Sequence, residues 1–130
     1  MTSPLASWPQ FDDEQLAVAA QVLRSGRVNS WTGGETTAFE QEFAAWSSST
    51  HAIAIANGSL ALSSAYLATG LGQGDELITT PRTFIATASS AVLLGTKPVF
   101  ADVDPNSGAV TASTIAPLIT PRTKAISVVH

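Results

Sequence analysis

Apolar residues recur at helical spacing in two stretches near the N-terminus. The first stretch opens at Asp12, because acidic residues favour the positive end of a helix dipole and Gln15 stands where it completes a capping box. It ends at Gly26, a residue type that commonly follows the last helical turn. The second stretch begins near Thr37, with Glu40 three residues later as its capping partner. The pattern therefore predicts two helices.

The second of these helices has an aromatic face. Phe39, Phe43 and Trp46 follow one another at i, i+4 and i+7, so they lie on the same side of a helix. We expect this side to pack against a core. Residues 27–35, between the two helices, are polar and predict a loop.

Short apolar runs alternate with helical stretches from residue 51 onward. The predicted strands are 51–56, 76–79, 98–101 and 124–129. The predicted helices are 60–69, 84–94 and 111–118. The first of these helices is apolar on nearly all sides and is expected to be buried, and Thr83 is expected to cap the second. Strands alternating with helices are typical of an α/β protein with a parallel sheet and right-handed crossovers.

Composition narrows the function classes. The 130 residues are 45% hydrophobic and only 12% charged, which favours a folded domain with a core over a disordered chain. The formal net charge of −4 offers no basic surface for a phosphate backbone, so nucleic-acid binding is not expected. The absence of cysteine excludes disulfides and thiolate zinc sites, and His51 and His130 show no metal-ligand spacing, so no metal is predicted.

The N-terminus and the apolar runs predict a location. The first residues lack a basic start and an apolar stretch, and Pro4 and Pro9 interrupt them, so they do not resemble a signal peptide. No apolar run reaches the roughly 18 residues that a membrane span needs. We therefore expect a cytoplasmic protein without membrane insertion.

The first candidate for chemistry is the turn Asn57-Gly58-Ser59, which joins a predicted strand to a predicted helix. The first N–H groups of a helix point outward and favour an anion, so Gly58, Ser59 and Leu60 are candidates to hold a phosphate, with the Ser59 hydroxyl assisting. The turn is neither a P-loop nor a dinucleotide fingerprint. A purely structural turn is the alternative.

The second candidate is Phe84, at the start of the next helix and again at the carboxyl end of a strand. Ligands of parallel sheets bind at that end, and an aromatic ring there can cover a flat cofactor. Plain core packing is the alternative for this residue.

Two polar features are interpreted structurally. Asp102 and Asp104 are close enough to suggest acid–base chemistry, but Asp104-Pro105-Asn106 fits a turn better. The segment Thr80-Pro81-Arg82-Thr83 recurs as Thr120-Pro121-Arg122-Thr123, once after a predicted strand and once before one. Because the contexts differ, we interpret the repetition as coincidence.

A set of short segments extends in order along nearly the whole chain. The segments are Ser25-Gly26-Arg27 through Gly33, Phe39-Glu40, Phe43-Ala44, His51-Ala52, Asn57 to Leu62, Gly72 to Ile78, Thr83 to Thr87, Lys97 to Asp104 and Ile119 to Ile126, ending at Val129-His130. In this order they resemble the sugar aminotransferases of the DegT/DnrJ/EryC1/StrS family. Each segment is common alone, and the specificity lies in their shared order.

The resemblance implies a function and roles for residues. The family uses pyridoxal 5'-phosphate (PLP) to move an amino group, usually from glutamate, to a nucleotide-linked keto sugar for lipopolysaccharide O-antigens and other surface polysaccharides. Gly58, Ser59 and Leu60 would hold the cofactor phosphate, and Phe84 would stack on its ring. The loop with Trp31, Thr32 and Gly33 would lie near the substrate in the active site of a homodimer.

The resemblance also implies an architecture, the N-terminal part of an aspartate-aminotransferase-like large domain with a mostly parallel sheet and helices on both faces. Residues 1–50 would be N-terminal helices with a loop, and 51–130 an incomplete PLP-binding α/β domain. In this fold the strand at 51–56 lies far from the next three, with later strands between, so we expect open strand edges.

The residues that complete the chemistry are not expected within this chain. In the family, the lysine of the internal aldimine and the acid beside the pyridine nitrogen follow the segment matching Val129-His130. The only lysines here, Lys97 and Lys124, fall in segments that the family uses to enter strands. We therefore expect no catalytic residue here, an inactive fragment, and an aldimine lysine beyond residue 130.

Two alternatives stay open. One is a non-catalytic α/β module that binds a nucleotide or a sugar nucleotide. The other is a PLP-dependent sugar dehydratase of the same family, in which a histidine replaces the lysine.

Overall fold

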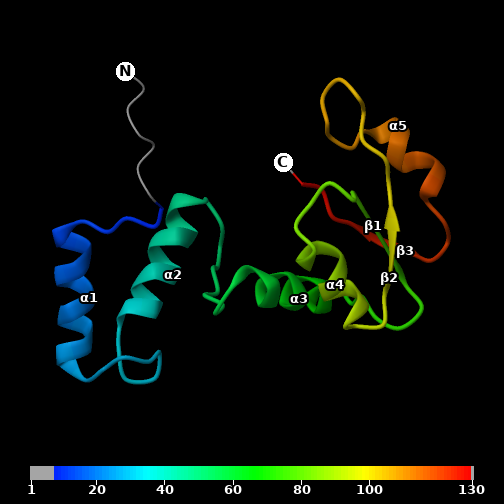
Figure 1. Cartoon of the computed structure of the whole chain (residues 1–130). Coiled ribbons are helices and arrows are strands. Elements are labelled where there is room, and N and C mark those ends of the chain that lie inside the picture. The colour runs from blue at the N-terminus through cyan, green and yellow to red at the C-terminus, as the bar shows by residue number, and fades with distance from the viewer. Residues whose placement is uncertain (1–7, 130) are drawn as a thin grey trace, which may run out of the picture. The chain divides into compact units, whose positions relative to one another are not determined.

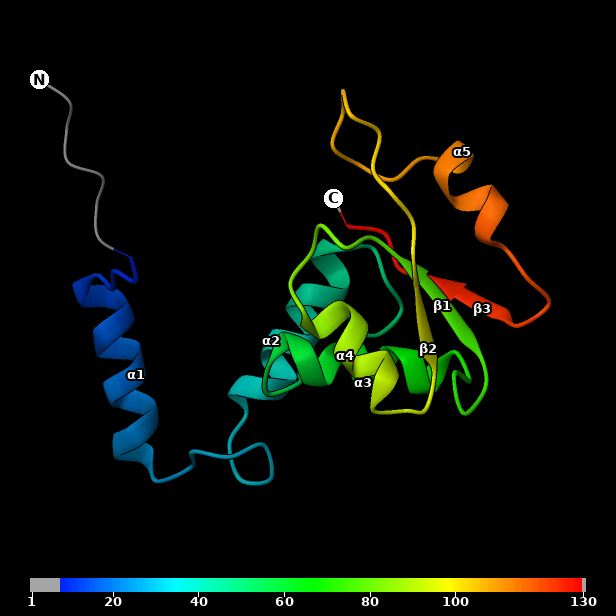
Figure 2. The ribbon, with the colours of Figure 1, turned by 45° about the vertical axis from the view of Figure 1, so that its right-hand side comes forward.

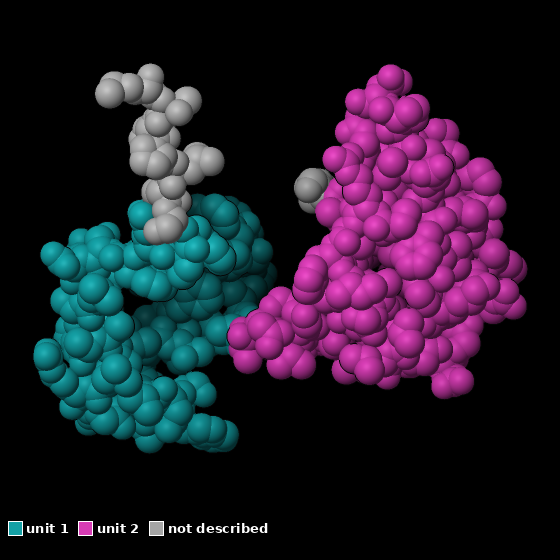
Figure 3. Space-filling model, in the orientation of Figure 1, with its two compact units in different colours: residues 1–54 teal, residues 55–130 magenta. Residues whose placement is uncertain are grey.

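The structure of the chain is a computed structural model that describes residues 8–129. Residues 1–7 and 130 lie outside the described part, and with them the predictions made on Pro4 and His130. The chain forms two compact units, residues 1–54 and 55–130, and each is described by itself (Figure 3). Within residues 8–129, no helix combines the length and the apolar character needed to cross a membrane.

The first helix of unit 1, α1 (Asp13–Ser25), has the ends that its sequence predicts (Figure 1). Asp12 Oδ1 accepts the N–H of Gln15 at 2.8 Å, and Gln15 Oε1 accepts the N–H of Asp12 at 3.0 Å. Gly26 follows with a φ of 70°, the left-handed conformation that glycine adopts without strain. Local chemistry therefore sets both ends of α1.

The second helix, α2 (Glu35–Trp46), begins earlier than the predicted Thr37. Gly34 precedes it without a side-chain cap, so the predicted capping role of Glu40 is wrong. The Glu40 carboxylate instead accepts the N–H of Ala54 at 2.8 Å, a bond that ties the end of unit 1 back to α2.

The aromatic face of α2 forms, but it does not pack into a core. The ring centroids of Phe39 and Phe43 are 5.7 Å apart, and those of Phe43 and Trp46 are 5.3 Å apart. All three side chains are exposed, Trp46 to 80%, and none of residues 8–54 is buried. Within unit 1, therefore, the face does not pack into the predicted core.

Residues 51–56 do not form the predicted strand. No strand in the described part of the chain pairs with them, and Ile53 is 78% exposed. Ala52 and Ala54 are half-buried while Ile53 and Ile55 are exposed, so the segment keeps the two-residue period of a strand. It lacks the hydrogen-bonded neighbour that makes an extended segment a strand.

Unit 2 is built on a parallel sheet of three strands in the order β2-β1-β3. The strands are β1 (Glu76–Thr79), β2 (Lys97–Phe100) and β3 (Thr123–Ile126) (Figures 1 and 2). The bounds of β1 are those predicted, whereas β2 and β3 each begin one residue earlier than predicted. Leu77 pairs with Pro98 on one side and with Ala125 on the other. These pairings confirm an α/β fold with a parallel sheet.

The helices of unit 2 are α3 (Gly58–Ala68), α4 (Ala86–Val92), α5 (Ala112–Ile115) and the 3-10 turn η1 (Ala116–Leu118). The prediction that α3 is buried is wrong. Of its residues only Tyr66 is buried, and Leu60 and Leu67 are more than half exposed. Tyr66 and Leu62 are the side chains of α3 that pack in or against the core of unit 2, and the uniform apolar composition does not reveal which residues these are.

The helix α4 is shorter than the predicted 84–94, and Thr83 does not cap it. The Thr83 hydroxyl instead lies 2.9 Å from the Thr87 hydroxyl, one turn further along. Thr111 does cap α5, through a capping box with Thr114, so the predicted helix at 111–118 is confirmed as α5 continued by η1.

The core of unit 2 lies between one face of the sheet and the helices α3 and α4. Its buried members are Tyr66, Leu71, Leu77 and Ala91, with Leu62, Leu94 and Ala125 packed against them. The Tyr66 hydroxyl is within hydrogen-bond distance of the Thr87 carbonyl, at 3.0 Å, and of the Ser127 hydroxyl, at 3.2 Å. These contacts join α3, α4 and the end of β3.

The amino ends of the three strands meet at one buried carboxylate, that of Glu76, which is 2% exposed. Arg122 donates two hydrogen bonds to Oε1, at 3.0 and 3.2 Å, and the Thr120 hydroxyl donates to Oε2 at 2.6 Å. Lys97 Nζ lies 3.6 Å from Oε1. The hydrogen bond from Thr120 contributes most to lowering the pKa of Glu76 below its ordinary value, Arg122 and Lys97 add to this, and burial opposes it.

Candidate functional site

A helix N-terminus with unpaired donors faces solvent at the start of unit 2. The helix α3 begins directly after Asn57, whose backbone is extended with a φ of −164°. The Asn57 side-chain oxygen accepts the N–H of Leu60 at 3.0 Å. Among the described residues, no acceptor bonds the N–H groups of Gly58 and Ser59. The cap therefore occupies the donor of Leu60 and leaves those of Gly58 and Ser59 for a ligand.

The space beside these donors is open. A Cβ atom added at Gly58 would meet no atom within 4 Å, and both Gly58 and Ser59 are exposed. The helix has 11 residues, long enough for several aligned peptide dipoles to act at its N-terminus. Two N–H donors and a hydroxyl at such a terminus form a donor set that fits a phosphate group.

The adjoining helix fixes the start of α3. The buried Ser90 of α4 donates its hydroxyl hydrogen to the carbonyl of Ser59 at 3.2 Å. The two helices run side by side in both views (Figures 1 and 2). The structure therefore places Gly58 and Ser59 at the start of α3 and Phe84 just before the neighbouring helix α4, in the same unit.

Phe84 lies in the turn after β1, at the carboxyl end of that strand. Its carbonyl accepts the N–H of Thr87 at 3.1 Å, but its side chain is 74% exposed. Phe84 is therefore not part of the core of unit 2. The ring stands at the edge of the sheet where ligands of parallel sheets bind.

The third set of candidates, Trp31, Thr32 and Gly33, lies in unit 1 and forms an ordered turn. Asn29 Oδ1 accepts the N–H groups of Trp31 and Thr32, at 3.0 and 3.1 Å, and the Asn29 carbonyl accepts the N–H of Gly33 at 2.8 Å. The Trp31 side chain is 94% exposed. Sequence reasoning missed Asn29, although an asparagine just before such residues is a known turn signal.

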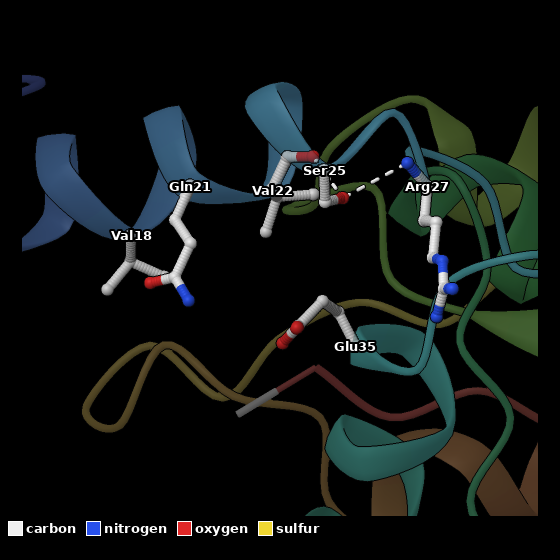
Figure 4. Close-up of a pocket in the computed structure, with 6 residues that line it drawn as sticks. All are labelled: Val18, Gln21, Val22, Ser25, Arg27 and Glu35. Atoms are coloured by element: carbon white, nitrogen blue, oxygen red, sulfur yellow. Dashed lines mark hydrogen bonds between the residues drawn. The ribbon is translucent and has the colours of Figure 1, made fainter.

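Unit 1 also contains a hollow of about 350 Å³ between α1 and α2 (Figure 4). Its lining residues are Val18, Gln21, Val22, Ser25, Arg27 and Glu35. The Ser25 hydroxyl oxygen accepts the N–H of Arg27 at 3.0 Å, and the polar ends of Gln21 and Glu35 extend into the hollow (Figure 4). None of the predicted site residues lines it.

Asp104 begins a turn, as predicted for Asp104-Pro105-Asn106. Asp104 Oδ1 accepts the N–H groups of Asn106 and Ser107, at 3.1 and 2.8 Å. The backbone hydrogen bond from Ser107 is the main cause that lowers the pKa of Asp104 below its ordinary value. Within residues 8–129, no group of three or more histidine, aspartate and glutamate side chains is placed to hold a metal ion.

Both lysines lie at the amino ends of strands. Lys97 is the first residue of β2 and approaches Glu76, and Lys124 is the second residue of β3. Gly58 and Ser59 instead begin the helix α3, and Phe84 lies between the carboxyl end of β1 and the start of α4. This placement agrees with the prediction that the two lysines lie in segments that lead into strands.

Comparison with known proteins defines the class. A sequence model of the DegT/DnrJ/EryC1/StrS aminotransferase family matches residues 9–130, and the chain belongs to this family. Over 124 residues it is 39% identical to the spore coat polysaccharide biosynthesis protein SpsC of Bacillus subtilis (strain 168), a match that covers 95% of this chain and 31% of SpsC.

Solved structures give the same fold. The aminotransferase from Psychrobacter cryohalolentis is 49% identical with a TM-score of 0.91, and the match covers 95% of this chain and 31% of that protein. The 3-amino-5-hydroxybenzoic acid synthase is 36% identical with a TM-score of 0.86, over 93% of this chain and 32% of that one. The fold is therefore that of part of an aminotransferase, and the chain spans about a third of the length of these relatives.

Proposed function

We propose that this chain supplies the phosphate-binding turn and the ring-covering phenylalanine of a PLP-dependent aminotransferase. The reaction would transfer an amino group from glutamate to a nucleotide-linked keto sugar. One observation carries the proposal: the unpaired N–H groups of Gly58 and Ser59 stand at a helix N-terminus, in the same unit as the exposed ring of Phe84.

The donor set of the turn fits the phosphate of PLP. The N–H groups of Gly58 and Ser59 and the Ser59 hydroxyl would bind its oxygens, and the open space at Gly58 admits the group without a clash. The N–H of Leu60 already bonds Asn57, so Leu60 would contribute only if that cap bond were exchanged.

Phe84 would orient the cofactor ring and exclude water from one of its faces. When bound, PLP would supply an electron sink for the transfer of the amino group. The chain's own part is therefore to bind and orient. The lysine and the acid that the family uses for proton transfer are proposed to lie in polypeptide beyond residue 130.

The substrate class rests on the relatives. SpsC is described as a protein of spore coat polysaccharide biosynthesis, and the Psychrobacter protein as an aminotransferase. We infer an amino-sugar step in the biosynthesis of a surface polysaccharide such as a lipopolysaccharide O-antigen, carried out by a cytoplasmic homodimer. The exposed Trp31, with Thr32 and Gly33, would contact the sugar nucleotide.

The test compares the 130-residue chain with the corresponding full-length protein, each incubated with PLP, glutamate and a panel of keto sugar nucleotides. We expect the full-length protein to show a cofactor absorption band that borohydride abolishes, and glutamate-dependent amination of one substrate. We expect the chain alone to show neither.

The other outcomes separate the alternatives. Loss of water from the sugar without amino transfer would assign the dehydratase instead. A full-length protein that binds a sugar nucleotide but no PLP would assign the non-catalytic module. Robust turnover by the 130-residue chain would contradict the proposal that the lysine lies beyond it.

A further inference from the structure

We propose that Arg82 is a positioning residue, whose bond to the loop after β2 holds the turn that presents Phe84 to the cofactor ring. The inference rests on the proposed function, in which Phe84 covers that ring. It concerns a contact between two loops at the carboxyl edge of the sheet.

Phe84 has little packing of its own to hold it in place, since its side chain is 74% exposed. Its position therefore depends on the backbone of the turn at 80–85. This turn starts at Thr80, which is 3% exposed, and the Thr80 hydroxyl oxygen accepts the N–H of Arg82 at 3.1 Å. The turn is thus anchored in the unit at its first residue.

Arg82 extends the anchoring to a second loop. Its Nη1 donates to the carbonyl of Gly108 at 2.9 Å, and Gly108 belongs to the loop that follows β2. That loop is closed by its own hydrogen bonds, from Gly108 N–H to the Asp104 carbonyl at 2.8 Å and from Asp104 N–H to the Ala109 carbonyl at 2.9 Å. Arg82 is therefore bonded to an ordered partner.

The guanidinium group of Arg82 lies where a side chain at position 108 would begin, so any larger residue there would have to move it. Gly108 has a φ of 67°, and a Cβ atom there would collide with Arg82 Nη1. Beside this bond lies a hollow of about 320 Å³, whose lining includes Thr80, Arg82, Ser107 and Val129. Removal of the Arg82 side chain would therefore enlarge an existing gap between the two loops.

A second contact holds Thr83, the residue directly before Phe84. The Thr83 hydroxyl lies 2.9 Å from the Thr87 hydroxyl, which fixes Thr83 to α4. Phe84 thus follows two successive residues that are each tied to a different element. Thr83 contacts α4, whereas Arg82 bonds the loop after β2.

The test is a double-mutant cycle on PLP affinity in the full-length protein. Stacking of aromatic rings is worth a factor of roughly two to ten, so Phe84→Ala should weaken PLP binding by about that factor. Arg82→Ala should also weaken PLP binding, but by a smaller factor, because the ring of Phe84 is still present. In the double variant the two losses should not multiply, because Arg82 acts only through Phe84.

Ser59→Ala is the matched control, because it acts on the phosphate end of the cofactor. Its loss should multiply with that of Arg82→Ala. Arg82→Lys, which keeps a cation able to reach the Gly108 carbonyl, should recover most of the affinity. Hydrogen exchange without PLP should be faster at the amides of residues 82–85 in Arg82→Ala than in the unsubstituted protein, and unchanged at α3.

The outcomes distinguish this inference from the proposed function. Unchanged PLP affinity in both Phe84→Ala and Ser59→Ala would overturn the site itself. Losses in those two variants with none in Arg82→Ala, or a loss that multiplies fully with Phe84→Ala, would overturn the positioning role alone. If Arg82→Ala does not fold, Arg82→Gln takes its place in the cycle, with Arg82→Lys still expected to bind PLP almost normally.

Discussion

The sequence Thr-Pro-Arg-Thr occurs at residues 80–83 and 120–123, at opposite ends of the sheet. The arginines of the two copies bind different partners. In both copies the threonine hydroxyl oxygen accepts the arginine N–H at 3.1 Å, so the local turn is shared. At the amino end, Arg122 bonds the buried carboxylate of Glu76 twice. At the carboxyl end, Arg82 makes a single bond, to the carbonyl of Gly108.

The difference shows that the turn is set locally, whereas the role of the arginine is set by what the fold places opposite it. A buried carboxylate needs its partners, because an uncompensated charge inside a protein is costly. An exposed carbonyl has water as an alternative partner. We therefore expect the amino end to carry stability and the carboxyl end to carry function.

The largest effect that separates the two copies should be on thermal stability. Arg122→Ala leaves Glu76 with only Thr120 and Lys97, so the Tm of the chain should fall by several degrees. Arg82→Ala, the matched change in the other copy, should leave Tm nearly unchanged. Calorimetry on both variants measures the contrast, and equal shifts in Tm would contradict the assignment of roles.

The pH dependence of stability should follow the same asymmetry. The pKa of Glu76 is lowered in the folded state from its ordinary 4.5, so folding favours the ionised carboxylate. This contribution is present above pH 4.5 and is lost as the pH falls through the lower, folded-state pKa. Arg122→Ala should reduce it, so the stability difference between this variant and the unsubstituted chain should shrink in acid.

Denaturant titrations at pH 7 and at acidic pH values below 4.5 measure this difference. Arg82→Ala serves as the control, because its arginine bonds a carbonyl that does not titrate. A difference between Arg122→Ala and the unsubstituted chain that stays constant with pH would show that Glu76 is not the partner that matters.

At the carboxyl end, the expected effects are on the cofactor. Ser59→Ala removes a hydroxyl donor to a phosphate, and a hydrogen bond to a charged group corresponds to roughly ten- to a hundred-fold in affinity. PLP binding to the full-length protein should weaken by that factor with Tm in the absence of PLP unchanged. Ser64→Ala, an exposed serine further along α3, is the matched control and should bind PLP normally.

Sequence reasoning succeeded where the determinants are local. The caps of α1, the turn at Asp104 and the strand β1 follow from residues a few positions apart, although the caps predicted at Glu40 and Thr83, which are equally local, did not form. Membership of the family was also predicted correctly from the sequence, because it rests on the order of short segments along the chain.

Sequence reasoning failed where the outcome depends on a distant surface. The aromatic face of α2 and the apolar sides of α3 are exposed, because burial needs an opposing layer. The segment at 51–56 lacks the neighbour that would make it a strand. The bonds of Arg122 to Glu76, 46 positions away, left no local signal, so the two Thr-Pro-Arg-Thr copies looked alike.

A smaller effect should separate two glycines. Gly108→Ala forces an alanine into the left-handed region, which costs about 1–2 kcal/mol, and its Cβ would displace Arg82. Gly58→Ala meets no atom within 4 Å and should cost much less in unfolding free energy. Chemical denaturation of the two variants measures the contrast, and equal losses would show that the loop around Gly108 adjusts freely.

The smallest effect should come from replacing each arginine by lysine. Arg122→Lys cannot keep two parallel bonds to Glu76, because an ammonium group lacks the planar fork of guanidinium, so its Tm should fall, though less than in Arg122→Ala. Arg82→Lys retains a donor for the single bond to Gly108, so both Tm and PLP affinity should stay close to those of the unsubstituted protein. Matched melting curves for the two variants test this. A larger loss in Arg82→Lys than in Arg122→Lys would mean that the carboxyl-end copy depends on guanidinium geometry after all.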